Sequence, residues 1–182
     1  MLDAAALRAE VERCLSRRSF ASAEFLAMKL WSLTRQPQYA LLLARALAAL
    51  GQLARAAYFL EAFDLPRSSL DALLLASQCW MATGKLDQAM AALESFLGDS
   101  SVAELLRRPE DCELLALLCF ERGRGFARQE NRLSALRWYK AALHLNPKCT
   151  EALDAILAAH LRPAELQALM HSLRDWSNLP AP

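Results

Sequence analysis

The sequence carries no excess of charge of either sign, with 21 Lys and Arg residues against 20 Asp and Glu residues among 182. A chain this balanced has no strong field to attract nucleic acid or an anionic membrane surface. It also lacks any apolar run of 18 or more residues, the length that a membrane span needs. The opening residues, Met1, Leu2 and Asp3, do not begin a signal peptide, which has a basic region followed by an apolar core. We therefore expect no nucleic-acid partner and no membrane partner.

Histidine and cysteine are few, at three and five residues, and they form no recognisable site. The cysteines are odd in number and irregularly spaced, which predicts thiols in a reducing compartment, the cytoplasm or the nucleus. We expect Cys14, Cys79 and Cys119 to lie on buried helix faces. Cys112 and Cys119 are seven residues apart, but no partner completes a zinc set. Without a phosphate loop or an activated nucleophile either, we expect no catalytic residue, metal or cofactor, and no enzyme.

Glycine is scarce, with 5 residues, whereas alanine and leucine are abundant, and this composition favours long helices. Four alanines mark a repeat, because Ala23, Ala56 and Ala89 are 33 residues apart and Ala135 follows after one period plus a short insertion. A period of about 33–34 residues with a small residue at the helix crossing is the signature of tetratricopeptide repeats. The predicted fold is all-α, a tetratricopeptide-repeat solenoid of antiparallel helix pairs with about four to five repeats.

We expect a single domain over residues 1–177, followed by a tail or linker at 178–182. Its repeats fall near 4–36, 37–69, 70–98, 112–148 and 149–175, with an insertion at 98–111 that contains a single helical turn. Gly51 and Gly84 each precede an alanine of the series by five residues, at a turn where glycine readily adopts a positive φ. The helix that follows Gly51 is predicted to end before Pro66, because proline interrupts the helical hydrogen-bond ladder.

The repeat around Ala135 matches the pattern best. Gly123 falls on the small position of its first helix, so that Gly123 and Ala135 allow two antiparallel helices to approach closely. Phe126 and Tyr139 fall on the aromatic positions and should fill the space beside that contact. Pro147 should end the second helix.

In this repeat class the first helix of each pair lines a concave groove, and residues two, five, nine, twelve and thirteen of the repeat face inward. The lining is mixed apolar and polar, which suits a helix laid in the groove better than a charged tail. The groove residues that we expect to bind protein are Leu41, Arg45, Leu74, Gln78, Met81, Phe120 and Arg124. An alternative interpretation is that Leu41, Leu74 and Phe120 only bury against neighbouring repeats.

The first helix, expected to end at about Ser16, has an apolar stripe formed by Leu2, Leu7, Val11 and Leu15. This stripe is more apolar than the end cap of a repeat stack needs. Because an exposed apolar cap should find a partner, we expect these four residues to take part in a homodimer.

Particular runs of residues resemble one family of repeat proteins. Residues 131–145, 149–154, 19–30 and 158–173 are similar to the N-terminal part of the cell-division-cycle sixteen (Cut9) subunits of the anaphase-promoting complex. The resemblance implies a non-catalytic scaffold of this cell-cycle E3 ubiquitin ligase, active in mitosis in the nucleus and cytoplasm. It also implies a homodimer in which the first helices of one subunit lie in the groove of the other, stacked with other tetratricopeptide subunits.

Two further interpretations stay open. The related cell-division-cycle twenty-seven subunit has a similar N-terminal dimer. A peptide-binding adaptor, such as a co-chaperone, would hold the carboxylate of an extended tail in a basic, Asn-rich groove. The groove positions here offer Arg45, Arg124 and Arg128 but no Lys or Asn, which counts against an adaptor.

Overall fold

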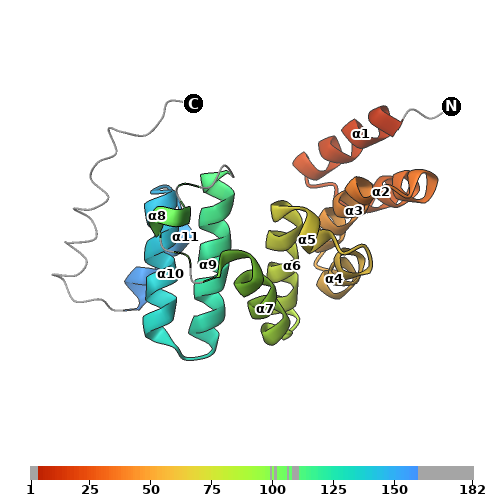
Figure 1. Cartoon of the computed structure of the whole chain (residues 1–182). Coiled ribbons are helices and arrows are strands. Elements are labelled where there is room, and N and C mark those ends of the chain that lie inside the picture. Colours follow the sequence, from red (N-terminus) through yellow and green to blue (C-terminus); the bar gives the residue numbers. More distant parts are fainter. Residues whose placement is uncertain (1–3, 99, 101, 106, 108–110, 160–182) are drawn as a thin grey trace. The chain divides into compact units, whose positions relative to one another are not determined.

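The computed structural model describes residues 4–98, 100, 102–105, 107 and 111–159, and every regular element among them is an α-helix (Figure 1). The chain divides into two compact units, Met1–Ala92 (unit 1) and Leu93–Pro182 (unit 2). The helices are α1 (Ala4–Ser16), α2 (Phe20–Thr34), α3 (Pro37–Ala49), α4 (Leu53–Ala62), α5 (Leu65–Ser68), α6 (Leu70–Ala82), α7 (Leu86–Leu97), α8 (Val102–Leu105), α9 (Cys112–Arg128), α10 (Arg132–Leu145) and α11 (Thr150–Ala158). The boundary between the units falls within α7.

Helices pack mainly on their neighbours in sequence. In unit 1, α1 packs on α2, α2 on α3, α3 on α4, and α4 on α6. In unit 2, α9 runs antiparallel to α10 along most of its length (Figure 1), and α10 also contacts α8 and α11. The predicted all-α arrangement of antiparallel helix pairs is confirmed.

The alanine series lies in the interior. Ala23, Ala56 and Ala89 have no exposed surface, and Ala135 retains 3%. Protein interiors are packed as densely as organic crystals, so a larger side chain at any of these positions would have to displace its neighbours. The repeat register read from the alanines therefore agrees with the packing.

In each of the four helix pairs, the turn between the two helices contains one residue with a left-handed backbone conformation. This residue lies five positions before the alanine of the series that belongs to that pair. These residues are Arg18, Gly51, Gly84 and Glu130, with φ of 60°, 78°, 81° and 60°. In each turn the next backbone N–H donates to a carbonyl five residues back, as in Gln52 to Leu47 at 2.9 Å. This is the hydrogen bond of a Schellman motif, which satisfies a carbonyl at the end of a helix.

The close helix crossing predicted at Gly123 is confirmed. A Cβ placed on Gly123 would lie 2.5 Å from Cε1 of Tyr139 and 3.2 Å from the carbonyl oxygen of Ala135. Real Cβ atoms do not approach a ring carbon so closely, and the absent side chain is therefore what lets α9 lie against α10. Phe126, expected beside this contact, is half-buried, and α10 ends at Leu145, two residues before Pro147.

A buried arginine, Arg122, stands directly before Gly123 in α9. Arg122 is 3% exposed, its guanidinium donates to the carbonyl oxygen of Gly98, and its Cζ lies 4.3 Å from the ring centroid of Trp138. The carbonyl belongs to the residue that follows α7, and the ring belongs to α10. Arg122 thus makes a hydrogen bond and a cation–π contact, each of which offsets part of the cost of burying its charge.

The helix that follows Gly51 ends before Pro66 as predicted, and a further single-turn helix, which was not predicted, contains Pro66. Helix α4 ends at Ala62, and the single-turn helix α5 begins at Leu65 with Pro66 in its first turn. Proline at this place starts a helix instead of ending one, because the first N–H groups of a helix need no partner within it. The predicted turn in the insertion is α8, whose Leu105 is fully buried. The end of the fifth repeat and the tail at 178–182 lie outside the described residues.

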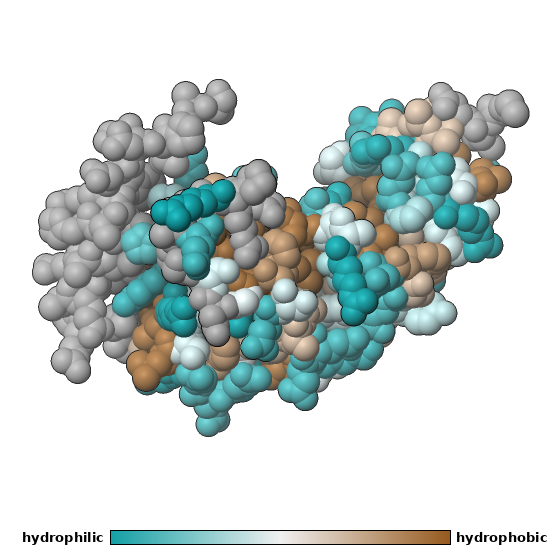
Figure 2. Space-filling view, in the orientation of Figure 1, coloured by the Kyte–Doolittle hydropathy of each residue, from teal (hydrophilic) through white to brown (hydrophobic). Residues whose placement is uncertain are grey.

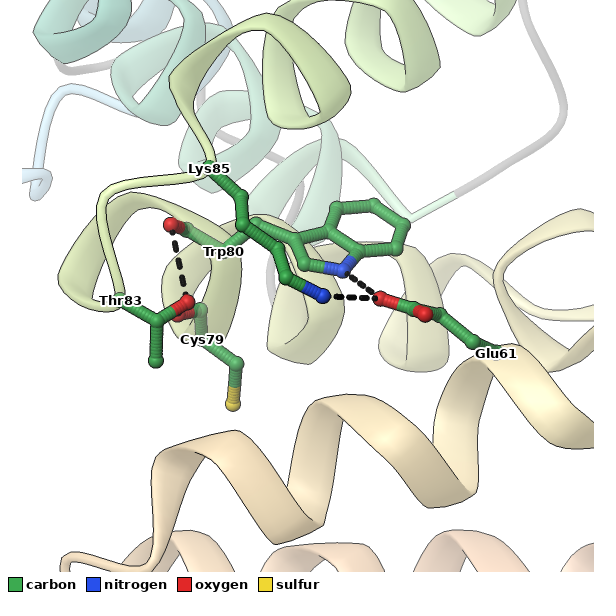
Figure 3. A network of polar contacts seen from close by, with 5 residues as sticks. All are labelled: Glu61, Cys79, Trp80, Thr83 and Lys85. Carbon is green, nitrogen blue, oxygen red and sulfur yellow. Dashed lines mark hydrogen bonds and ion pairs between the residues drawn. The ribbon is translucent and has the colours of Figure 1, made fainter.

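A polar network joins the second and third repeats of unit 1 (Figure 3). The indole N–H of Trp80 in α6 donates to Oε1 of Glu61 in α4 at 2.5 Å, and Nζ of Lys85 lies 3.3 Å from the same oxygen. Partial burial alone would raise the pKa of Glu61, but the hydrogen bonds from Trp80 and Lys85 outweigh burial and hold that pKa below its ordinary value. The carboxylate is therefore better stabilised in the folded chain than in the unfolded one.

We expect Glu61→Gln to destabilise unit 1 at neutral pH by at most about 1 kcal/mol, because Glu61 is partly exposed and solvent screens its charge. A lowered folded-state pKa contributes stability above the unfolded pKa of about 4.3, and that contribution disappears as the pH falls through the folded value. The difference in thermal midpoint between wild type and variant should therefore shrink from pH 7 towards pH 3.5. Glu94→Gln, at the same position of the next repeat, is the control for the general effect of replacing Glu with Gln. A pH-independent difference would contradict the role of the charge.

Candidate protein-binding groove

A small cavity lies between the first helices of the first two pairs, α1 and α3. Its volume is about 180 Å³, and its lining residues are Arg8, Glu12, Gln38, Tyr39, Leu41, Leu42 and Arg45. Sites for small molecules usually enclose about 300–1,000 Å³. This cavity is therefore of a size to receive one or two side chains of another protein.

Charge at the cavity is compensated within the chain. Nε of Arg8 lies 2.9 Å from Oε1 of Glu12 one helical turn away, and Nη2 of Arg45 lies 2.9 Å from Oδ1 of Asp71. The second pair links α3 to α6, which pack together. Both pairs are solvent-exposed, so each adds little to stability. Because their charges cancel in pairs, the cavity presents no net field to a charged tail.

The apolar stripe of the first helix is largely used inside unit 1. Leu7 is 8% exposed and Val11 is fully buried, in a helix that packs on α2. Leu15 is half-buried, and Leu2 lies outside the described residues. The side of α1 that reaches the cavity carries Arg8 and Glu12 instead, two residues that the sequence interpretation did not single out. Their opposite charges at i and i+4 were the available signal.

The predicted groove residues of the third repeat lie on α6 in three different environments. Leu74 is half-buried and Gln78 is exposed, whereas Met81 is only 1% exposed. Met81 therefore contributes to the interior of the chain. Leu74 and Gln78 follow Asp71 at helical spacing, so they continue the surface that begins at the Arg45–Asp71 pair.

Phe120 and Arg124 belong to unit 2 and form their own cluster on α9. Nη1 of Arg124 lies 3.0 Å from both carboxylate oxygens of Glu121, a residue only 2% exposed. The Arg124 guanidinium stands 5.8 Å from the ring centroid of Phe120, which in turn lies 5.7 Å from that of Tyr139. These contacts hold the Arg124 side chain in one place on the helix surface.

Within the described part of the chain, no three side chains of His, Cys, Asp or Glu gather where they could hold a metal ion. The same residues include no helix with both the length and the apolar character needed to cross a bilayer. None of the five cysteines forms a disulfide; Cys79 and Cys119 are buried as expected, and Cys14 is half-buried. Burial raises the pKa of Cys79 to about 11, which leaves little reactive thiolate at neutral pH.

Comparison with known sequences identifies similar proteins. The family model described as anaphase-promoting complex, cyclosome, subunit 3 matches residues 16–96. Anaphase-promoting complex subunit 6 of Arabidopsis thaliana is 29% identical over 183 residues, covering 94% of this chain and 34% of the relative. The cell division cycle protein 16 homolog of Homo sapiens is 30% identical over 186 residues, covering 92% of this chain and 30% of the relative. The chain spans about a third of the length of these relatives.

Solved structures that resemble this chain include a protein of the same complex and a tetratricopeptide protein. The crystal structure of the APC/C hetero-tetramer Cut9–Hcn1 matches with a TM-score of 0.82 and 26% identity, over 94% of this chain and 32% of that one. The tetratricopeptide protein YrrB matches with a TM-score of 0.65 and 19% identity, over 84% of this chain and 73% of that one. The second likeness is one of fold, and it confirms the tetratricopeptide type predicted from the repeat period.

Proposed function

Since the chain is related to the tetratricopeptide region of anaphase-promoting complex subunits of the Cdc16, Cut9 and APC6 group, we propose that it is a non-catalytic scaffold of this cell-cycle ubiquitin ligase. In this role it homodimerises through its N-terminal repeats and stacks with other tetratricopeptide subunits, in the nucleus and cytoplasm. Relatives that are themselves named as subunits of the complex support a place for this chain in that assembly.

The observation that carries the dimer is the cavity between α1 and α3. It is open to side chains of another protein, is too small for most ligands, and has Leu41 and Arg45 among its lining residues. The similar Cut9–Hcn1 structure is described as a hetero-tetramer, so at least one of its two named proteins is present in more than one copy, which supports self-association.

In the proposed dimer, a helix of the second copy lies along α1, α3 and α6. Leu41 forms the apolar floor of the contact, and the Arg8–Glu12 and Arg45–Asp71 pairs flank it. Because Leu7 and Val11 face the chain's own interior, they support the shape of α1 and do not touch the partner.

Molar mass measured by light scattering tests the dimer. The wild-type chain should have twice its mass of 20.2 kDa at micromolar concentration. Leu41→Glu places a carboxylate on the apolar floor and Arg45→Glu reverses a charge beside it, so either should weaken association at least about ten-fold. Ala91→Glu, at an exposed position of α7 that does not line the cavity, is the matched control and should remain dimeric.

Circular dichroism separates association from folding. Arg45 is exposed, so Arg45→Glu should keep the wild-type melting profile even if Leu41→Glu does not. A wild-type mass of 20.2 kDa at high concentration would remove the dimer and favour a peptide-binding adaptor. A dimer that survives Arg45→Glu and Leu41→Glu with unchanged affinity would place the interface elsewhere.

A further inference from the structure

Unit 1 exposes large apolar side chains on two helices only, within its described residues. Phe25 (67%), Leu33 (62%) and Met28 (37%) lie on α2, and Tyr58 (67%) and Phe63 (38%) lie on α4 and its C-cap. We call these five residues the α2–α4 face. In the view of Figure 2, hydrophobic residues (brown) are exposed at several places between hydrophilic ones (teal). None of the five lines the cavity between α1 and α3.

Side-chain contacts place α2 and α4 next to each other. The ring centroids of Trp31 and Phe59 lie 5.6 Å apart, and those of Trp31 and Phe63 lie 5.4 Å apart. Nearer the start of the helices, Nη1 of Arg55 lies 3.0 Å from Oε1 of Glu24. The two helices are thus joined at both ends of the exposed stretch, which spans two turns of α2, or about 12 Å.

The exposed aromatics recur at one repeat position. Phe25 and Tyr58 each follow an alanine of the series by two residues, and both are 67% exposed. The same position holds Ala91 in the third repeat and Arg137 in the fourth. The aromatic pair is therefore confined to the first two repeats, where α2 and α4 are neighbours. Exposed aromatic side chains that need no partner inside the chain are typical anchors of protein interfaces.

Unbalanced positive charge surrounds the same face. Four basic side chains lie on α2 or within three residues of its ends: Arg17, Arg18, Lys29 and Arg35. None of them has a carboxylate partner among the described residues. The other Lys and Arg side chains of the described part of unit 1 all form ion pairs, namely Arg8, Arg13, Arg45, Arg55, Arg67 and Lys85. The unpaired cations thus gather where the apolar side chains are exposed.

We propose that the α2–α4 face docks an acidic amphipathic helix of a partner protein. Two turns of such a helix would cover Phe25, Met28 and Tyr58 with their apolar side, while their carboxylates reach Lys29 and the arginines at the ends of α2. This surface is separate from the proposed dimer groove and carries a different partner.

The charges near the α2–α4 face disfavour two other partners, a second copy of this chain and an anionic bilayer. A second copy of this chain, docked through the same face, would bring its own four unpaired cations towards those of the first. An anionic bilayer would also meet the carboxylates that α4 and its C-terminal end carry, Glu61 and Asp64. A narrow acidic helix along α2 meets Lys29 and the arginines at the ends of α2, and the one carboxylate of α2, Glu24, is paired with Arg55.

Fluorescence anisotropy with two labelled peptides tests the proposal. Each peptide is an amphipathic helix of about 18 residues with Leu and Trp on one side, and its polar side consists of Glu in one and Lys in the other. The full chain should bind the Glu peptide at least about ten-fold more tightly than the Lys peptide, with an affinity that falls as salt rises. The double variant Phe25→Ser with Tyr58→Ser should lose at least about ten-fold in affinity for the Glu peptide, and Lys29→Glu several-fold.

Leu133→Ser is the matched control, because Leu133 is 83% exposed but lies in unit 2. The affinity of this variant for the Glu peptide should equal that of wild type. All substituted side chains are solvent-exposed, so circular dichroism should show native melting in each variant. Equal binding of both peptides, or full binding by the double variant, overturns the proposal. So does a molar mass lowered by Phe25→Ser with Tyr58→Ser, or binding to phosphatidylserine vesicles that this double variant abolishes, because each identifies another occupant. The groove variants Leu41→Glu and Arg45→Glu should leave peptide binding unchanged, which keeps this test independent of the dimer.

Discussion

Gly123→Val is expected to destabilise unit 2 by about 3 kcal/mol, at the upper end of the usual cost of overpacking. The new Cβ would overlap the Tyr139 ring, whose Cε1 is 2.5 Å away, and would press on a backbone carbonyl oxygen at 3.2 Å. The ring can move only by losing its own packing, since Tyr139 is 6% exposed, and the backbone of α10 cannot yield without shifting the helix. Thermal and urea unfolding of the variant would measure the loss.

Two comparisons assign that loss to the crossing of α9 and α10. Ala127→Val introduces the same side chain on the exposed side of α9 and should cost only a few tenths of a kcal/mol in helix propensity. Tyr139→Ala removes the ring that a Cβ at Gly123 would overlap, so Gly123→Ala should cost much less in that background than in wild type. Additive effects of Gly123→Ala and Tyr139→Ala would show that the two positions do not touch.

Ala56→Leu should destabilise unit 1 by about 2 kcal/mol, because Ala56 is fully buried and has no room for further carbon atoms. Ala54→Leu on the same helix is the matched control, since Ala54 is exposed and leucine is nearly as good a helix former as alanine. The thermal midpoint of Ala56→Leu should fall by several degrees while that of Ala54→Leu stays within a degree or two. Equal midpoints would mean that the alanine series does not mark the tight positions of the repeats.

The tightly packed positions could be predicted from the sequence because they recur at a fixed spacing in each repeat. Ala23, Ala56 and Ala89 fix the register by their spacing alone, and Gly123 with Tyr139 follows from that register. The same regularity placed Leu41 and Arg45 on one side of α3, where both line the cavity.

Other features could not be predicted from the sequence, because they depend on contacts that the repeat pattern does not specify. The left-handed φ of Arg18 and Glu130 could not be expected from side chains that usually avoid it, whereas Gly51 and Gly84 indicated it directly. The stripe of α1 was read as an exposed cap, although Leu7 and Val11 pack inside unit 1. Hydrophobic periodicity identifies the apolar side of a helix but does not say whether the chain itself or a partner covers it.

The four left-handed turns have a consequence for the speed of folding. Each joins two helices that are adjacent in the chain, so the loop that must close before a pair can form is only a few residues long. The entropy lost on closing so short a loop is small, and chains dominated by local contacts are the fastest to fold. Folding can therefore start at any of the four turns. A pair weakened by substitution then delays its own formation more than that of the other pairs, as in other repeat proteins.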